Sequence, residues 1–217
     1  MKKTAVIFDM DGLLIDSETV YYKGYVDKGN EFGIEISKDI FRNFLGKKIE
    51  NIIGEINRMY ENMADGAKIV ENAKNYMMDI VNSDRELPLK KGALDVLESL
   101  KSKGYILALA TSNYKAVAEK MLLKTKTYDY FEVIIYGDNV KHGKPAPDIF
   151  LKCLKKLQVS KEEAVVLEDS ENGVLAAHNA GIDVICVPDM VYPREEIAEK
   201  AAYIAKDLYE AYDFIIK

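Results

Sequence analysis

Four short apolar segments constrain the fold of this chain of 217 residues more than any other feature. They are rich in Val and Ile, they lack polar alternation, and they comprise Thr4–Phe8, Tyr105–Ala110, Ala164–Leu167 and Asp183–Val187. Strands of this kind occur in parallel sheets that are covered on both faces. Two weaker candidates for strands are Glu132–Tyr136 and Tyr203–Ala205. The sequence therefore predicts a parallel sheet at the centre of the fold.

Helical patterns lie between these strands. Apolar residues recur at helical spacing over residues 93–100, and again at Phe150, Leu151, Leu154 and Leu157. Gly104 suits the end of the first helix, and Pro147 suits the first turn of the second. Strands that alternate with helices imply right-handed crossovers. We therefore expect an α/β fold, with a Rossmann-like, three-layer, doubly wound parallel sheet.

One long interval interrupts this alternation. About a hundred residues separate Phe8 from Tyr105 without a convincing strand, and residues 16–84 carry a helical pattern instead. A crossover between parallel strands needs only about 10–12 residues. We therefore predict an α/β core formed by residues 1–15 and 85–217, with an inserted α-helical cap subdomain at residues 16–84.

Charge and hydropathy exclude several classes of protein. The net charge is −6 and there is no basic stripe, which argues against binding of nucleic acid through its phosphates. No apolar stretch approaches the roughly 20 residues that span a bilayer. Asp9 and Asp11 interrupt the first apolar run before it is long enough for a signal peptide. We expect a cytoplasmic protein that does not bind membranes, with Cys153 and Cys186 as buried thiols.

Acidic residues follow the first strand in the sequence Phe8-Asp9-Met10-Asp11-Gly12. In open α/β sheets ligands bind beyond the carboxyl ends of the strands, so both carboxylates are candidate functional groups. Two residues that are two apart on an extended backbone point to opposite sides, so the aspartates can have different roles. Gly12 permits a sharp turn beside them. The alternative is a polar strand end without a function.

Two further strand ends and one loop carry polar groups. Thr111, Ser112 and Asn113 offer hydroxyl, amide and N–H groups for an anion, although Asn113 could equally cap the following helix. Lys144 lies between Gly143 and two prolines, which would hold a single positive charge in place. A solvated surface lysine is the alternative interpretation.

Glu168 and Asp169 follow the apolar strand at 164–167. Adjacent acids at the end of such a strand need a compensating partner. Together with Asp9 and Asp11 they would form a cluster of four carboxylates, which are the hard oxygen ligands that Mg²⁺ prefers. A bound Mg²⁺ would also offset the repulsion between these carboxylates and an anionic substrate.

These strand-end elements together resemble the haloacid dehalogenase superfamily. The resemblance lies in DxDG at 9–12, Thr111 after an apolar strand, Lys144 in GKPxPD, and Glu168-Asp169 followed by GxxAAxxAG at 173–181. The motifs occur in the family's order and span the chain from Asp9 to Gly181. The helical insertion after the first motif resembles the cap subgroup that includes phosphoglycolate phosphatase and β-phosphoglucomutase.

The resemblance implies a role for each matched residue. Asp9 would attack phosphorus and become an aspartyl-phosphate, while Asp11 would protonate the leaving oxygen and then activate water. The phosphoryl oxygens would be held at Thr111 and by backbone groups at Gly12, Ser112 and Asn113. Lys144 would balance the negative charge. The Mg²⁺ cofactor would bind Asp9, the backbone carbonyl of Asp11, Asp169 and Glu168, the last either directly or through water.

The same resemblance implies that the insertion acts as a lid over the substrate. Lys47 and Lys48 are candidates for contact with the substrate, with solvated surface lysines as the alternative. Tyr21, Tyr22 and Tyr25 fit core or wall positions better than ligand positions. The expected protein is a monomer that binds a small-molecule phosphate ester.

The expected reaction is hydrolysis of a small phosphate monoester, either a sugar or a polyol phosphate. A β-phosphoglucomutase-type reaction is the alternative, but Tyr21 and Ile49 stand where those mutases carry a cap histidine and a cap arginine. A phospho-accepting signalling domain is a remote alternative. The long insertion and the DxDG order disfavour it.

Overall fold

The computed structural model describes residues 3–61 and 63–217, and the chain divides into two compact units. One unit comprises the residues up to Ile15 together with Pro88–Lys217, and the other comprises Asp16–Leu87. Within the described ranges, no helix combines the length and the apolar character needed to cross a membrane.

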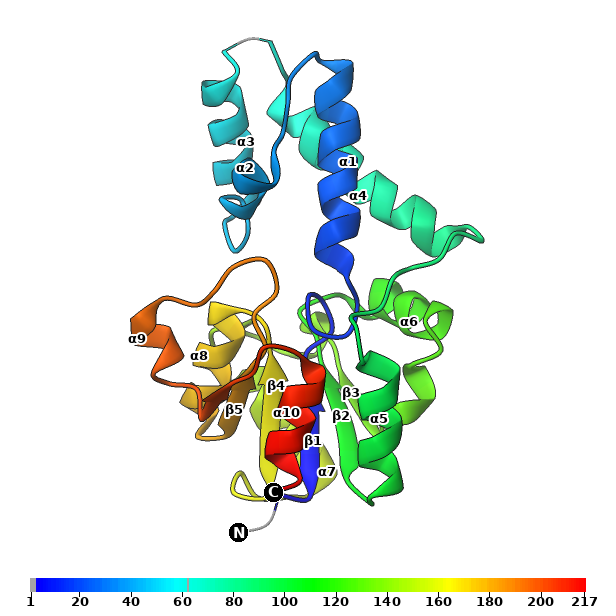
Figure 1. Ribbon diagram of the computed structural model, residues 1–217, viewed down its shortest axis with the longest axis vertical. Coiled ribbons are helices and arrows are strands. Elements are labelled where there is room, and N and C mark those ends of the chain that lie inside the picture. Colours follow the sequence, from blue (N-terminus) through cyan, green and yellow to red (C-terminus); the bar gives the residue numbers. More distant parts are fainter. Residues whose placement is uncertain (1–2, 62) are drawn as a thin grey trace. The chain divides into compact units, whose positions relative to one another are not determined.

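Six parallel strands form the sheet of the first unit (Figure 1). They are β1 (Ala5–Phe8), β2 (Ile106–Ala110), β3 (Val133–Ile135), β4 (Ala164–Glu168), β5 (Asp183–Cys186) and β6 (Tyr203–Ile204). The strand order is β3-β2-β1-β4-β5-β6, so β1 lies between β2 and β4. All six predicted strands are confirmed, each within one residue at either end.

Helices cover both faces of this sheet (Figure 1). On one face α5 (Ala93–Ser102) contacts β2 and α10 (Leu208–Ile215) packs beside α5. On the other face α7 (Asp148–Leu157) contacts β2 and β3, and its neighbour α8 (Glu171–Ala180) contacts β5. The remaining helices of the unit are α6 (Lys115–Lys124) and α9 (Glu195–Ala198), with short 3₁₀ turns η1 (Tyr128–Tyr130) and η2 (Gly137–Asn139). The predicted Rossmann-like, doubly wound α/β fold is confirmed.

Buried small and apolar side chains fill the layer between the sheet and helices α7 and α8. Ile7 and Val166, from the two central strands, belong to the same cluster as Phe150 and Cys153 of α7. Cys153 and Cys186 are both buried free thiols, as predicted. Burial raises the pKa of each thiol to about 12, which keeps both protonated at neutral pH.

Two helix-end expectations and one expected apolar position have different outcomes. Gly104 has a φ of +82°, and the N–H of Tyr105 reaches back to the carbonyl of Leu100, so the predicted glycine at the end of α5 is confirmed. Pro147 immediately precedes α7 rather than lying in its first turn, and its carbonyl accepts the N–H of Leu151. Leu151 itself is 46% exposed, because the buried face of α7 runs through Ile149, Phe150 and Cys153.

The alternative interpretation, in which Asn113 caps the helix after β2, is wrong. Helix α6 begins one residue later than such a cap requires, with Tyr114 at the N-cap position. The side chain of Asn113 instead bonds to Asp11, which is 102 positions away in the sequence. A tertiary partner therefore replaces the local capping interaction.

In its described residues, 16–61 and 63–87, the second unit contains four helices, α1 (Ser17–Glu31), α2 (Lys38–Arg42), α3 (Ile49–Met59) and α4 (Gly66–Asn82). Helices α1 and α4 pack closely, since a Cβ on Gly24 would lie 2.6 Å from the Cα of Ala73. Tyr25 is buried and its ring contacts Phe41 and Phe44, so its predicted core position is confirmed.

Candidate active site

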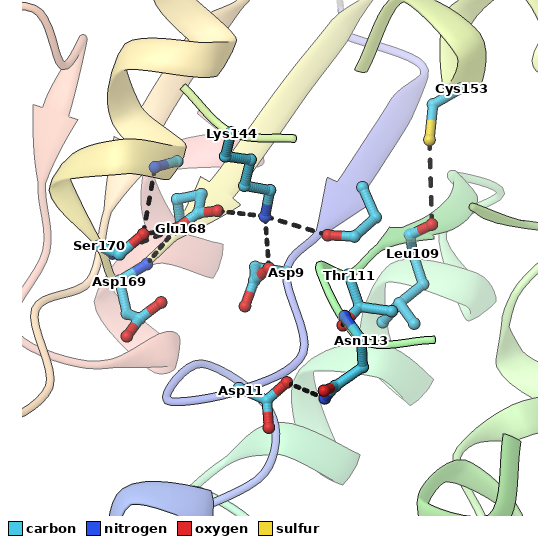
Figure 2. Close-up of polar contacts among 12 residues, drawn as sticks. Asp9, Asp11, Leu109, Thr111, Asn113, Lys144, Cys153, Glu168, Asp169 and Ser170 are labelled. Atoms are coloured by element: carbon cyan, nitrogen blue, oxygen red, sulfur yellow. Dashed lines mark hydrogen bonds and ion pairs between the residues drawn. The ribbon is translucent and has the colours of Figure 1, made fainter. Parts of the chain in front are cut away.

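Polar residues gather where β1, β2 and β4 end. Asp9 follows β1, Thr111 follows β2, and Glu168 is the last residue of β4. Backbone hydrogen bonds continue the sheet to this edge, because the N–H of Asp9 donates to Leu167 at 3.0 Å. Since the three strands are parallel neighbours, their carboxyl ends bring these side chains together (Figure 2).

Lys144 is the central cation of this cluster. Its Nζ lies 2.5 Å from Asp9 Oδ1, 2.5 Å from Glu168 Oε1 and 3.1 Å from the carbonyl oxygen of Ala110. The lysine side chain is only 6% exposed. An ammonium group has three donor hydrogens, and three acceptors meet them here. The loop before α7 therefore places the buried ammonium group of Lys144 between the carboxylates that follow β1 and end β4.

Burial dominates the electrostatics of Asp9. Loss of solvent raises the pKa of Asp9 to about 7, and the nearby Glu168 and Asp11 carboxylates act in the same direction, while Lys144 lowers it. Burial alone would lower the pKa of Lys144, but the attraction of Asp9 and Glu168 holds it above its usual range. The lysine therefore stays charged, whereas Asp9 needs further positive charge to be fully ionised at neutral pH.

Glu168 is fully buried and bonded at both oxygens. Oε1 accepts from Lys144, while Oε2 accepts from the N–H of Asp169 at 3.0 Å and from Ser170 through its N–H at 3.1 Å and its hydroxyl at 3.0 Å (Figure 2). The same Ser170 hydroxyl caps α8 by accepting the N–H of Gly173. This network fixes the orientation of the Glu168 carboxylate.

Gly12 forms the expected sharp turn beside the aspartates. Its φ is +76°, and its N–H donates to the carbonyl of Ile15 at 2.9 Å. A Cβ at this position would lie 2.2 Å from Oδ2 of Asp169. The glycine therefore serves both the backbone turn and the close approach of a carboxylate from the neighbouring strand.

The two aspartates after β1 face different partners, as their spacing predicts. Asp9 bonds to Lys144, whereas Oδ2 of Asp11 accepts a hydrogen bond of 2.7 Å from Nδ2 of Asn113 (Figure 2). The N–H of Asn113 donates to Oγ1 of buried Thr111 at 3.1 Å, while Ser112 is exposed. The structure therefore brings the candidates from the first two strand ends into contact.

Gly137 and Ser170 were missed in the sequence as contributors to the site, and Gly173 was recognised only as part of the GxxAAxxAG motif. Ser170 and Gly173 shape the environment of Glu168, and Gly137 allows the loop after β2 to pass close to the loop after β3. A Cβ on Gly137 would lie 2.2 Å from the carbonyl oxygen of Ser112. For Gly137 the sequence did offer a signal, because it lies two positions after the end of β3. A glycine at such a place often marks a close approach of two backbones.

Carboxylate oxygens of Asp9, Glu168 and Asp169 lie within 4.8 Å of one another. Three hard oxygen donors at this spacing suit a divalent cation such as Mg²⁺. Burial and the neighbouring Glu168 and Asp11 carboxylates raise the pKa of Asp9, and a cation bound at this edge of the sheet would favour its ionised form. The donor set therefore fits Mg²⁺, with the side chain of Asp11 directed at Asn113 instead.

Lys47 and Lys48 belong to the second unit, whereas the residues described above belong to the first. Lys47 forms an ion pair of 2.7 Å with Glu55, and Lys48 is an exposed residue at the N-cap of α3. The contacts of Lys47 within its own unit resemble those of an ordinary surface lysine.

A doubly wound parallel sheet with a buried lysine and several carboxylates at its central strand ends defines an α/β enzyme with an acidic, metal-competent site. Residues 6–187 match the model of the haloacid dehalogenase-like hydrolases, and the chain belongs to this family. The family membership predicted from the sequence is confirmed.

Relatives of the chain include named phosphatases. A phosphorylated carbohydrates phosphatase from Thermotoga maritima is 36% identical over 184 residues, which cover 83% of each chain. Hexitol phosphatase B from Escherichia coli K12 is 31% identical over 186 residues, covering 85% of this chain and 83% of that protein. A crystal structure from Thermotoga maritima, provisionally assigned as a β-phosphoglucomutase, aligns with a TM-score of 0.78 and 32% identity over 100% of this chain and 99% of that one. The chain is therefore an enzyme of the hydrolase class to which these phosphatases belong.

Proposed function

We propose that this protein is a Mg²⁺-dependent phosphatase that hydrolyses a small sugar or polyol phosphate through an aspartyl-phosphate on Asp9. The observation that carries the proposal is the buried Lys144, which joins Asp9 to Glu168 beside the carboxylate of Asp169. The names of two relatives, a carbohydrate phosphatase and a hexitol phosphatase, support the substrate class.

In the first half of the proposed reaction, a carboxylate oxygen of Asp9 forms a bond to phosphorus as the bond between phosphorus and the leaving oxygen breaks. Asp11 donates a proton to that oxygen, so the sugar or polyol departs as a neutral alcohol. In the second half, Asp11 takes a proton from water, and the resulting hydroxide oxygen attacks the phosphorus. Asp9 is released as a carboxylate together with inorganic phosphate.

The transferring phosphoryl group needs positive charge and hydrogen-bond donors around it. Lys144 supplies the charge, and its contact with Asp9 supports this role. We assign the phosphoryl oxygens to the hydroxyl of Thr111 and to backbone groups near Gly12 and Ser112. Asn113 lies in the same loop, although its N–H is already donated to Thr111.

Asp9, Asp169 and the backbone carbonyl of Asp11 are the groups we assign to Mg²⁺. When bound, the cation neutralises charge at the phosphoryl oxygens and favours the ionised form of Asp9. Glu168 already accepts hydrogen bonds at both oxygens, which supports an indirect role for it through water. Its fixed charge holds Lys144 in place.

The helical unit would act as a lid that excludes water and selects the substrate. Its four helices form a compact body of their own, inserted between Ile15 and Pro88, which supports this role. Lys47 and Lys48 stay candidates for contact with the sugar or polyol. The monomeric state and the cytoplasmic location also stay predictions.

The test is release of inorganic phosphate from a panel of sugar and polyol phosphates, with Mg²⁺ and after removal of the metal by EDTA. We expect turnover of one or a few monoesters, loss of activity with EDTA, and recovery on addition of Mg²⁺. Asp9→Asn and Asp11→Asn should each lower kcat by several orders of magnitude while the folded state is retained. Near-normal activity of Asp9→Asn would rule out the aspartyl-phosphate.

A β-phosphoglucomutase reaction is the second candidate, favoured by the assignment of the similar Thermotoga maritima structure. Tyr21 and Ile49 argue against it, because neither supplies the imidazole or guanidinium expected of such a mutase at these positions. The panel therefore includes β-glucose 1-phosphate. Glucose 6-phosphate formed with little free phosphate would establish the mutase instead.

A further inference from the structure

Asn113 makes a contact that a phosphate-binding loop does not require. Its Nδ2 donates to Oδ2 of Asp11 at 2.7 Å, across the ends of the neighbouring strands β1 and β2 (Figure 2). A carboxylate can only accept a hydrogen bond when it is ionised, so the amide nitrogen must face it. The contact therefore places a neutral hydrogen-bond donor against the Asp11 carboxyl group and can orient it without adding a charge beside it.

The backbone of Asn113 is held from both sides. Its N–H donates to Thr111 Oγ1 at 3.1 Å, and its carbonyl accepts the N–H of Gly137 at 2.8 Å. Thr111 is fully buried, and its own N–H donates to Ile135 at 3.0 Å. These backbone hydrogen bonds join the loop after β2 to the end of β3 and the loop that follows it, and they fix the backbone of Asn113. A short side chain on such a fixed backbone has few positions available to it.

Lys144 donates to Asp9, to Glu168 and to the carbonyl of Ala110. Asp11 is absent from the three carboxylates that approach one another within 4.8 Å. Asp11 is also only partly buried, so solvent competes for its carboxylate. A partner that restricts its side-chain rotamers would therefore have a large effect on where a proton is delivered.

We propose that Asn113 is a positioning residue, which holds the carboxyl group of Asp11 in the orientation needed to protonate the leaving oxygen. This inference rests on the proposed function, in which Asp11 is the acid and base. Misplacement of a reacting group by about 1 Å can cost about 100-fold in rate, and general acid catalysis contributes about 10²- to 10⁴-fold. Loss of the Asn113 amide should therefore lower kcat/KM by about 10- to 100-fold, but only for esters whose leaving oxygen must receive a proton.

A comparison of two kinds of phosphate ester separates an effect on proton delivery from a general structural defect. Sorbitol 6-phosphate and fructose 1-phosphate leave as alkoxides and need the proton, whereas 4-nitrophenyl phosphate leaves as a stable phenolate and does not. The ratio kcat/KM reports steps from free enzyme to the first irreversible step, so it covers departure of the leaving group and excludes later hydrolysis of the phosphoenzyme. A general structural defect would lower kcat/KM for both kinds of ester.

The experiment compares Asn113→Ala and the similarly sized, uncharged Asn113→Leu with the wild type, and uses exposed Asn172→Ala as the matched control. We expect both Asn113 variants to lose about 10- to 100-fold in kcat/KM for the alkyl esters and less than about threefold for 4-nitrophenyl phosphate. Thermal unfolding confirms that each variant is folded. Parallel losses on both kinds of ester, or no loss on either, would overturn the inference.

Asp11→Asn separates this inference from the proposed function. It should show the same selective loss on alkyl esters, and more strongly than the Asn113 variants. If Asp11→Asn shows the loss and the Asn113 variants do not, only the positioning role is wrong. If Asp11→Asn handles alkyl and aryl esters with the wild-type ratio, the acid role of Asp11 in the proposed function is wrong as well.

Discussion

The carboxyl group of Glu168 occupies the space into which a side chain at Gly173 would extend. A Cβ on Gly173 would lie 1.7 Å from the carboxyl carbon of Glu168 and 1.8 and 2.1 Å from its two oxygens. Glu168 is fully buried and bonded to Lys144, Asp169 and Ser170, so it has no room to withdraw. Close packing of this kind transmits any change in volume to its neighbours.

Gly173→Ala should therefore destabilise the protein by about 2–4 kcal/mol, since overpacking would displace a buried, ion-paired carboxylate. Urea unfolding measures the change. Gly143→Ala is the matched control, because a Cβ on Gly143 meets nothing within 4 Å and should change stability by less than about 0.5 kcal/mol. Equal stability of the two variants would mean that Glu168 can leave its position at little cost.

Gly12→Ala should weaken binding of Mg²⁺ as well as stability. The φ of +76° costs an alanine about 1–2 kcal/mol, and the new Cβ would push Asp169 out of the acidic group. We expect the Mg²⁺ concentration for half-maximal activity to rise at least about tenfold, a loss of about 1.4 kcal/mol. Gly104→Ala shares the positive φ but has open space around it, so it should lose stability and keep the Mg²⁺ dependence of the wild type. Unchanged metal dependence in Gly12→Ala would remove Asp169 from the proposed ligands.

Lys144→Met should leave the buried carboxylates of Asp9 and Glu168 without their cation. Removal of one partner from a buried ion pair costs about 3–5 kcal/mol, and unfolding in urea without metal should show a loss of that size. Mg²⁺ should restore part of the loss, because it would supply positive charge to the same oxygens. Lys156→Met, at an exposed position of α7, should change little. A Lys144→Met protein as stable as the wild type would indicate that the two carboxylates take up protons at little cost.

The two thiols should be unreactive in the folded protein. Burial raises the pKa of Cys153 and Cys186 to about 12, so the thiolate that attacks a disulfide reagent is scarce at pH 8. Ellman's reagent should detect no thiol in the native protein and two per chain in guanidinium chloride. Rapid reaction of native protein would contradict the burial of both side chains.

The same shift predicts lower stability in alkali. Between its ordinary pKa of 9.0 and the folded-state pKa of about 12, an unfolded Cys153 releases its proton while the folded one retains it. The unfolded state then binds fewer protons, so the free energy of unfolding falls as pH rises through this range. Urea midpoints measured from pH 8 to 11 should decrease, and less steeply in Cys153→Ala. An equal slope in that variant would assign the effect to other groups.

The sheet and the strand ends that carry the candidate site could be predicted from local sequence patterns. Buried parallel strands are short and uniformly apolar, so β1, β2 and β4 were recognisable, and polar residues that follow such strands must meet at one edge. The turn at Gly12 could also be predicted, since a pair of acids followed by a glycine at a strand end is a local feature. For the same reason Gly104 was a clear end of α5.

Tertiary structure decided which of these groups touch. The sequence spacing between Asn113 and Asp11 carries no information about their contact, and local propensity favoured a helix cap for the asparagine. Lys144 likewise bonds to both Asp9 and Glu168 because three segments that are distant in the sequence come together in the fold. Patterns in sequence report local backbone preference and burial, whereas the pairing of buried charges and donors depends on the distances that packing imposes.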